Sequence, residues 1–243
     1  MNSTDFEGYT GMQLNDVTFS NDIMLLIVLI LLLTFAFIFR LNIPLFGKMI
    51  SNISSGEQRL SIFETTKKDS FLFTSFMTFQ TLLLCSIFIF TTTVEYKYIL
   101  KPDTVTTFTA TGILLIILFI FFLFKRALYA LFGHIFIEKS ANKMLFTNYQ
   151  AIFCTWGIFL YFPVLWILLV GKYFFIAITF MIISYLLFRL ILIYRFFYIF
   201  FNKNTGLLFF SLYLCGQEIV PLVFLYEGLI YMYNIIEKNN IWQ

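Results

Sequence analysis

The chain has 243 residues, of which 60% are hydrophobic, 21% aromatic and only 12% charged. A soluble globular domain carries about 25% charged residues. The composition therefore excludes a soluble enzyme, a disordered tail, a nucleic-acid binder and a disulfide-rich secreted scaffold. It predicts an all-α integral membrane protein, and the distribution of its charges is more informative than the net charge of +3.

Six segments are long and apolar enough for transmembrane helices, which need about 20 residues. They are residues 23–39, 71–91, 108–124, 149–170, 173–201 and 206–236. Each is continuously apolar, whereas the strands of a membrane β-barrel alternate apolar and polar side chains. We expect a bundle of about six helices over residues 23–236, with a polar tail at 1–22, cytoplasmic segments near 41–70 and 125–147, and a short tail at 237–243.

Lys and Arg residues indicate the orientation of this bundle. The connections after the first, third and fifth segments, with the ends of those segments, contain 12 of them, and the opposite side contains four. Cytoplasmic loops carry an excess of Lys and Arg, so we expect both termini outside the cytoplasm. An even number of crossings agrees with this, and the first segment is expected to be an uncleaved signal anchor.

The third segment is followed by a basic pair, Lys125 and Arg126. This pair lies about 25 Å from Phe108 at 1.5 Å per residue, near the inner membrane interface. Because no helix breaker follows before Gly133, we expect the helix to extend into the cytoplasm. Its exposed side is either a partner surface or packs on residues 41–70, and the candidate surface residues are Lys125, Arg126, Leu128, Leu131 and Phe132.

Two charged residues lie within the fifth and sixth segments, Arg189 and Glu218. Ionisable residues inside a bilayer are costly and often functional. They are equally distant from a turn near residues 202–205, so both lie about 18 Å from the inner ends of their helices. We predict that they pair or share a polar pocket, which either fixes helix register or handles a substrate or proton. In a third arrangement the two point apart and Arg189 extends to the interface.

Gln217 and Pro221 belong to the same candidate buried polar site. Pro221 has no N–H, so the carbonyl of Gln217 loses its helical partner. A kink and a free carbonyl beside Glu218 resemble a binding notch, although such kinks also serve packing alone. Gly157 and Pro163 have a similar, less sharp pattern in the fourth segment.

No other group of residues suggests catalysis or a cofactor. The single histidine, His134, lies outside the predicted crossings, which excludes haem held by two histidines and leaves a zinc site unexpected. Cys85, Cys154 and Cys215 each lie in an apolar run and are expected to be small core residues. We therefore expect no catalytic residue, no metal and no cofactor.

The string LYLCGQEIVPL at residues 212–222 resembles the signature LYLC-x-x-E-I-x-P-L of a family of bacterial polytopic inner-membrane proteins. This family is the domain of unknown function 4271, typical of Bacteroidota. Lys125-Arg126, Asn148-Tyr149 and Gly157 followed by Pro163 also fit, so the resemblance covers roughly residues 50–235. It implies the inner membrane of a diderm bacterium and points to envelope protein biogenesis, without an established activity.

These observations favour a non-enzymatic accessory or scaffold subunit of an inner-membrane assembly, such as one for membrane-protein insertion or protein export. Its expected partners are the lipid bilayer and other inner-membrane proteins, and not nucleic acid. The alternative is a small proton-coupled transporter or channel that uses Glu218. A third, less favoured function is that of an intramembrane enzyme acting on lipid, with Glu218 as general base.

Overall fold

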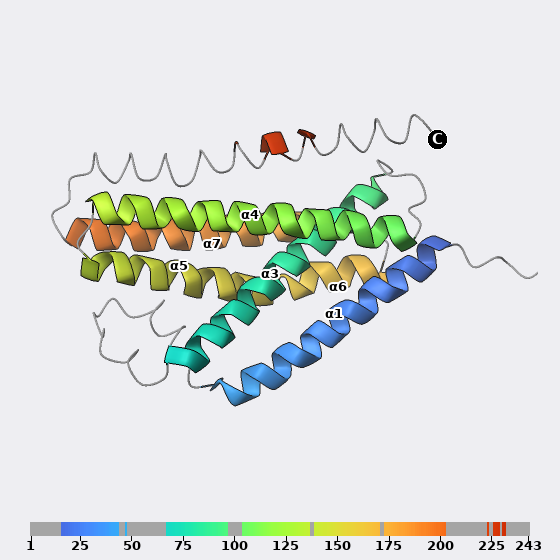
Figure 1. The fold of residues 1–243 in the computed structure, drawn as a ribbon. Coiled ribbons are helices and arrows are strands. Elements are labelled where there is room, and N and C mark those ends of the chain that lie inside the picture. Colours follow the sequence, from blue (N-terminus) through green and yellow to red (C-terminus); the bar gives the residue numbers. More distant parts are fainter. Residues whose placement is uncertain are drawn as a thin grey trace, which may run out of the picture.

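The computed structural model describes residues 16–43, 47, 67–96, 104–136, 139–170, 173–202, 223, 226–228, 230 and 231. Helices dominate this part of the chain, and no strand occurs in it, which confirms the predicted all-α class. The elements in chain order are α1 (Asp16–Leu41), α3 (Lys67–Glu95), α4 (Thr104–Phe136), α5 (Lys139–Phe159), α6 (Tyr161–Val170) and α7 (Phe174–Asn202) (Figure 1).

Five stretches of these helices are long and apolar enough to cross a membrane, as expected of a multi-pass membrane protein. They are Asp22–Leu41, Phe71–Glu95, Thr104–Leu131, Phe146–Val170 and Phe174–Phe197. They coincide with the first five predicted segments, although α1 already begins within the expected N-terminal tail. Most of the sixth segment lies outside the described residues, so the sixth crossing and the side of the termini stay predictions.

The chain crosses the bundle in alternating directions. The C-terminal ends of α1, α4 and α7 and the N-terminal ends of α3 and α5 lie toward one end, at the left of Figure 1. There Tyr129 of α4 contacts Tyr149 of α5 and Phe196 of α7, with ring centroids 4.5 and 5.7 Å apart. At the opposite end Tyr96, the residue directly after α3, contacts Phe174 of α7 with ring centroids 5.2 Å apart. We call the first end the basic end, because it contains Arg40, Lys125, Arg126 and Arg195.

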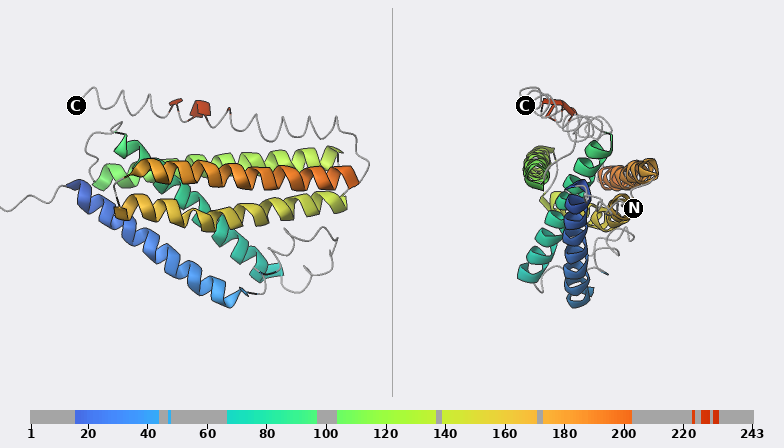
Figure 2. Two further views of the ribbon diagram at one scale, coloured as in Figure 1. Left: turned by 180° about the vertical axis from the view of Figure 1, so that it is seen from behind. Right: turned by 90° about the vertical axis from the view of Figure 1, so that its right-hand side faces the viewer.

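The central element is α3, which crosses α4, α5 and α7 obliquely (Figures 1 and 2). Of the residues in its membrane-crossing window 61% are buried, against 11% for α1 and 17% for α7. The amide Nε2 of Gln150 in α5 donates a hydrogen bond of 2.6 Å to Thr78 Oγ1 of α3. Polar residues between membrane helices form such bonds in place of contacts with lipid. This position explains why α3 carries threonines and Gln80 on buried faces.

Gly157 marks the closest approach of α5 to α3. A Cβ added to Gly157 would overlap Thr81 Oγ1 and lie 3.0 Å from Thr81 Cβ. The Thr81 hydroxyl donates to the carbonyl of Met77 at 2.7 Å, which fixes it toward Gly157. Gly157 therefore serves close helix packing, as small residues do in membranes, rather than the kink that the sequence suggested for it.

The helix of the fourth crossing is interrupted at Leu160, three residues before Pro163. Proline cannot donate a backbone hydrogen bond, and the carbonyl four residues earlier belongs to Phe159, the last residue of α5. The helix resumes at Tyr161 as α6. The proline half of the predicted pattern is therefore confirmed.

Two of the three cysteines lie in the core, as expected. Cys85 is 7% exposed and Cys154 is fully enclosed, and both are free thiols. Cys215 lies outside the described residues.

Candidate functional site

A group of basic and aromatic side chains lies between α4, α5 and α7 at the basic end. We call it the cationic–aromatic cluster; its members are Lys125, Tyr129, Tyr149, Tyr185 and Arg189. Lys125 and Tyr129 are four residues apart on α4 and so share a helix face. Both are buried. The Lys125 Nζ lies 5.8 Å from the Tyr129 ring centroid and 5.6 Å from that of Tyr149, within the range of a cation–π contact.

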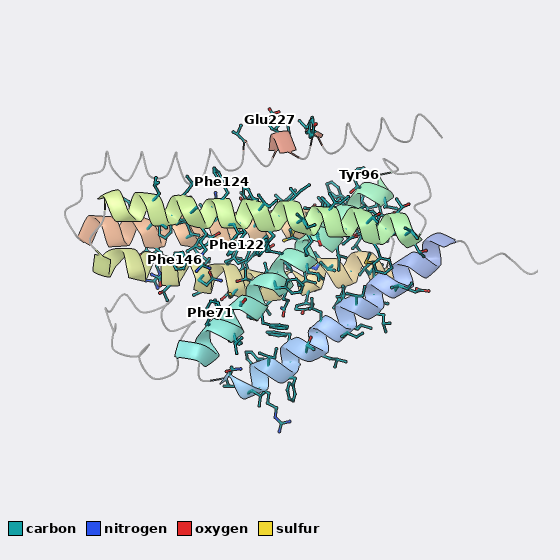
Figure 3. The ribbon with its side chains drawn as sticks, viewed as in Figure 1. Phe71, Tyr96, Phe122, Phe124, Phe146 and Glu227 are labelled. Carbon is teal, nitrogen blue, oxygen red and sulfur yellow. The ribbon has the colours of Figure 1, made fainter. Side chains whose placement is uncertain are left out.

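Tyr149 is the centre of the cluster. Its buried ring contacts Tyr129 as well as the Lys125 ammonium. Phe153 and Phe122 (Figure 3) stack on it with centroids 6.2 and 6.5 Å away. The geometry holds the ring in one orientation, so α5 presents a fixed aromatic surface to the cations of α4 and α7.

Helix α7 contributes Arg189, whose guanidinium lies 5.8 Å from the ring centroid of Tyr185, one helical turn earlier. Arg189 is half-buried and close enough to Lys125 and Tyr149 to act on both electrostatically. The sequence predicted an intramembrane charge at Arg189. The structure brings it together with Lys125, a second cation that sequence reasoning had placed elsewhere.

Two further polar side chains in α5 and α7 are buried, Asn148 at 3% and Arg195 at 7% exposure. Tyr149 and Phe196, the residues that directly follow them, both contact Tyr129. Within the described part of the chain, the Asn148 Nδ2 has no acceptor.

The other members of the predicted buried polar site, Gln217, Glu218 and Pro221, lie outside the described residues. The pairing of Arg189 with Glu218 therefore stays a prediction.

The residues of the predicted partner surface do not all lie on the outside of the bundle. Helix α4 continues to Phe136 without a break, as expected. Arg126 is exposed, with its guanidinium 4.6 Å from the ring centroid of Phe146 (Figure 3). Leu131 is exposed and Leu128 half-buried, whereas the side chain of Phe132 lies outside the described residues. Lys125 points into the bundle, so the expectation that it belongs to an outer surface is corrected.

Sequence reasoning missed Tyr129 and Tyr149 as members of a site. A signal for part of it was present, because a base and a tyrosine are spaced four apart in both α4 and α7. The resulting arrangement offers positive charge and N–H donors at fixed positions. Among the described residues, no group of three His, Cys, Asp or Glu side chains could hold a metal ion.

A family model matches most of the chain. Its description is "Domain of unknown function (DUF4271)", and it covers residues 23–229. No curated protein and no solved structure matches the chain.

Proposed function

The chain belongs to the DUF4271 family, and we propose that it is a non-enzymatic accessory or scaffold subunit of a larger membrane assembly. The assembly we favour is an inner-membrane one for membrane-protein insertion or protein export. The observation that carries the scaffold role is the aromatic ladder, the series of ring contacts that joins α4, α5 and α7.

The aromatic ladder runs from Tyr129 through Tyr149, Phe153 and Trp156 to Tyr185. Successive centroids are 4.5, 6.2, 6.1 and 5.8 Å apart. Rings at such distances attract one another by about 0.5–1.5 kcal/mol per pair beyond their burial. Interlocked rings resist the sliding of helices that a transport cycle needs. They suit a subunit that keeps its helices at fixed positions and presents their outer faces.

We propose that the outer face of α1 contacts a transmembrane helix of the partner. Helix α1 packs on the bundle through Met24 and Val28, which are 2% and 0% exposed, yet only 11% of its window is buried. Large apolar side chains spaced three or four residues apart form its outer face, as helix packing requires. They are Leu26, Ile30, Leu33, Phe37 and Leu41.

Copurification tests this function. The protein is isolated from its native membranes in mild detergent after in vivo cross-linking, as wild type and as two matched double variants. Leu33→Ala with Phe37→Ala alters the outer face of α1. Leu187→Ala with Leu190→Ala alters two exposed apolar residues of α7. We expect one membrane protein to copurify with wild type and the α7 variant and to be lost from the α1 variant.

Two results would contradict the proposal. If wild-type protein is recovered without any other membrane protein, the scaffold role is refuted. If both variants retain the partner equally, the proposed contact through α1 is refuted.

The alternative is a proton-coupled transporter or channel that uses Glu218. The observation that favours it is the presence of two cations inside the bundle, Lys125 and Arg195. Protein reconstituted in vesicles with an internal pH dye tests it. A proton flux that Glu218→Gln abolishes would support transport and argue against the scaffold role.

A further inference from the structure

The outward face of α7 has an exposed tyrosine at each end. Tyr173, directly before the helix, is 73% exposed, and Tyr194, near its C-terminal end, is 67% exposed. Every residue from 174 to 193 is described, and each exposed side chain among them is apolar. These side chains are Phe175, Ile176, Ile182, Ile183, Leu186, Leu187, Leu190 and Ile191. The outward face is therefore an apolar strip with a hydroxyl group at each end.

The length of this apolar strip matches the thickness of a bilayer. Tyr173 and Tyr194 are 21 positions apart in the chain, which is about 31 Å along an α-helix. The hydrocarbon core of a bilayer is about 30 Å thick. A helix tilt of about 20° shortens the span by only about 2 Å. The two tyrosines can therefore lie in both interfaces at once.

Contacts at the basic end place Tyr194 at a level where the bundle exposes a charge. Phe196 of α7 contacts Tyr129 of α4, and these two helices run in the same direction (Figure 1). Tyr194 and Arg126 precede the contacting rings by two and three residues, so they lie at nearly the same level. Arg126 is exposed, and an exposed charge is costly within the hydrocarbon core. Tyr194 therefore lies at the edge of that core.

At the opposite end, a second helix contributes a tyrosine at the level of Tyr173. Tyr96, which follows α3, is 46% exposed, and its ring contacts Phe174, the neighbour of Tyr173 (Figure 3). Exposed tyrosines from two different helices therefore lie together at this end.

The backbone of Tyr173 is in an unusual conformation. Its φ of 58° lies in the left-handed region, which glycine adopts freely and a residue with a Cβ adopts at a cost. Its carbonyl accepts a hydrogen bond of 2.9 Å from the Ile176 N–H. Glycine could form the same turn without strain, so the turn does not account for a large aromatic residue. Strain retained at an exposed ring suggests that the ring makes a contact outside the chain.

We propose that Tyr173 and Tyr194 anchor α7 in the two interfaces of the bilayer, where their hydroxyls donate to phospholipid ester and phosphate oxygens. Tyrosine suits this position because its ring is apolar and its hydroxyl forms hydrogen bonds. Tyrosines are also enriched at both membrane interfaces. The contact needs no particular headgroup charge, since every glycerophospholipid has these oxygens. The proposal concerns lipid contacts and does not depend on the scaffold role.

Fluorescence quenching by brominated lipids tests the depth of the two residues. The three native tryptophans are replaced with phenylalanine, and one tryptophan is introduced by Tyr173→Trp, Tyr194→Trp or Ile183→Trp. The protein is reconstituted in phosphatidylcholine vesicles that carry bromines at one known depth. We expect the tryptophans at the two ends to be quenched mainly by bromines near the headgroup, and the one at position 183, midway between them, by bromines near the bilayer centre. Deep quenching at either end, or one profile for all three variants, would overturn the proposal.

Thermal unfolding in the same vesicles without bromine tests whether the hydroxyls anchor the helix. Tyr173→Phe and Tyr194→Phe keep the rings and the backbone, so each should lower the midpoint by about 2–4 °C through loss of one hydrogen bond. Phe175→Leu changes a similarly exposed ring without a hydroxyl and should leave the midpoint unchanged. Unchanged midpoints for both tyrosine variants, or an equal fall for Phe175→Leu, would refute the anchors. This measurement keeps the native tryptophans, so it decides the question even if the tryptophan-free chain does not fold.

Discussion

Replacing Gly157 with alanine tests whether α3 and α5 are held at the distance that the structure shows. The new methyl group would overlap Thr81 Oγ1 and lie 3.0 Å from Thr81 Cβ. Overpacking of this kind costs about 1–3 kcal/mol. Displacing the hydroxyl also breaks its bond to the Met77 carbonyl, at about 1 kcal/mol. Alanine regains about 1 kcal/mol in helix propensity, so the net loss should be roughly 1–3 kcal/mol.

Thermal unfolding in detergent, followed by circular dichroism, measures this loss. A domain of 150–250 residues shifts by roughly 2–4 °C per kcal/mol, so we expect the midpoint to fall by about 2–12 °C. Gly112→Ala is the matched control, because no atom lies within 4 Å of a Cβ at Gly112; its midpoint should not fall. Thr81→Ala removes the overlapping oxygen, so it should recover part of the loss when combined with Gly157→Ala. An unchanged midpoint for Gly157→Ala, or equal effects of the two glycine variants, would refute the close approach.

Three further predictions follow from buried polar groups and thiols. Gln80 has an amide nitrogen and oxygen that are buried without a partner in the described part of the chain. Gln80→Leu should therefore keep or raise the unfolding midpoint, with a gain in the free energy of unfolding of up to about 1–3 kcal/mol. A clear fall of the midpoint would mean that the amide has a partner. Gln150→Leu removes the hydrogen-bond donor that joins α5 to α3. It should lower the free energy of unfolding by about 0.6 kcal/mol, and at most by about 1.7 kcal/mol, in an unfolding titration. A higher free energy of unfolding would contradict the hydrogen bond. In a Cys215→Ala background, a maleimide should label the buried Cys85 and Cys154 only after unfolding in detergent, and rapid labelling of native protein would disprove their burial.

The positions of the membrane crossings could be predicted from the sequence, because long apolar runs have few other stable environments. The residues at which the helices begin and end could be predicted less accurately. The third segment was predicted to begin at residue 108, yet α4 begins at Thr104. Threonines at its start remain helical, and Thr109 and Thr111 hydroxyls donate to carbonyls of the preceding turn. Such residues look polar in a sequence while their hydroxyls are satisfied by their own helix.

The composition of the candidate site could be predicted only in part. Arg189 stood out because it interrupts an apolar run. Lys125 was assigned to a surface because it precedes Arg126 at the end of such a run. Its inward direction depends on the ring of Tyr149 on a different helix, and no local pattern specifies that contact. The same holds for Gly157, whose role depends on Thr81 of α3.

The central position of α3 has a consequence for biosynthesis. Its Thr78 accepts a hydrogen bond from a residue 72 positions later in the chain. At a synthesis rate of roughly 5–20 residues per second, that partner emerges about 4–14 s after Thr78. During this interval the most polar of the described crossings has entered the bilayer without the helix that later covers it. Until α5 is inserted, the buried polar side chains of α3 therefore lack the packing partner that they have in the finished bundle.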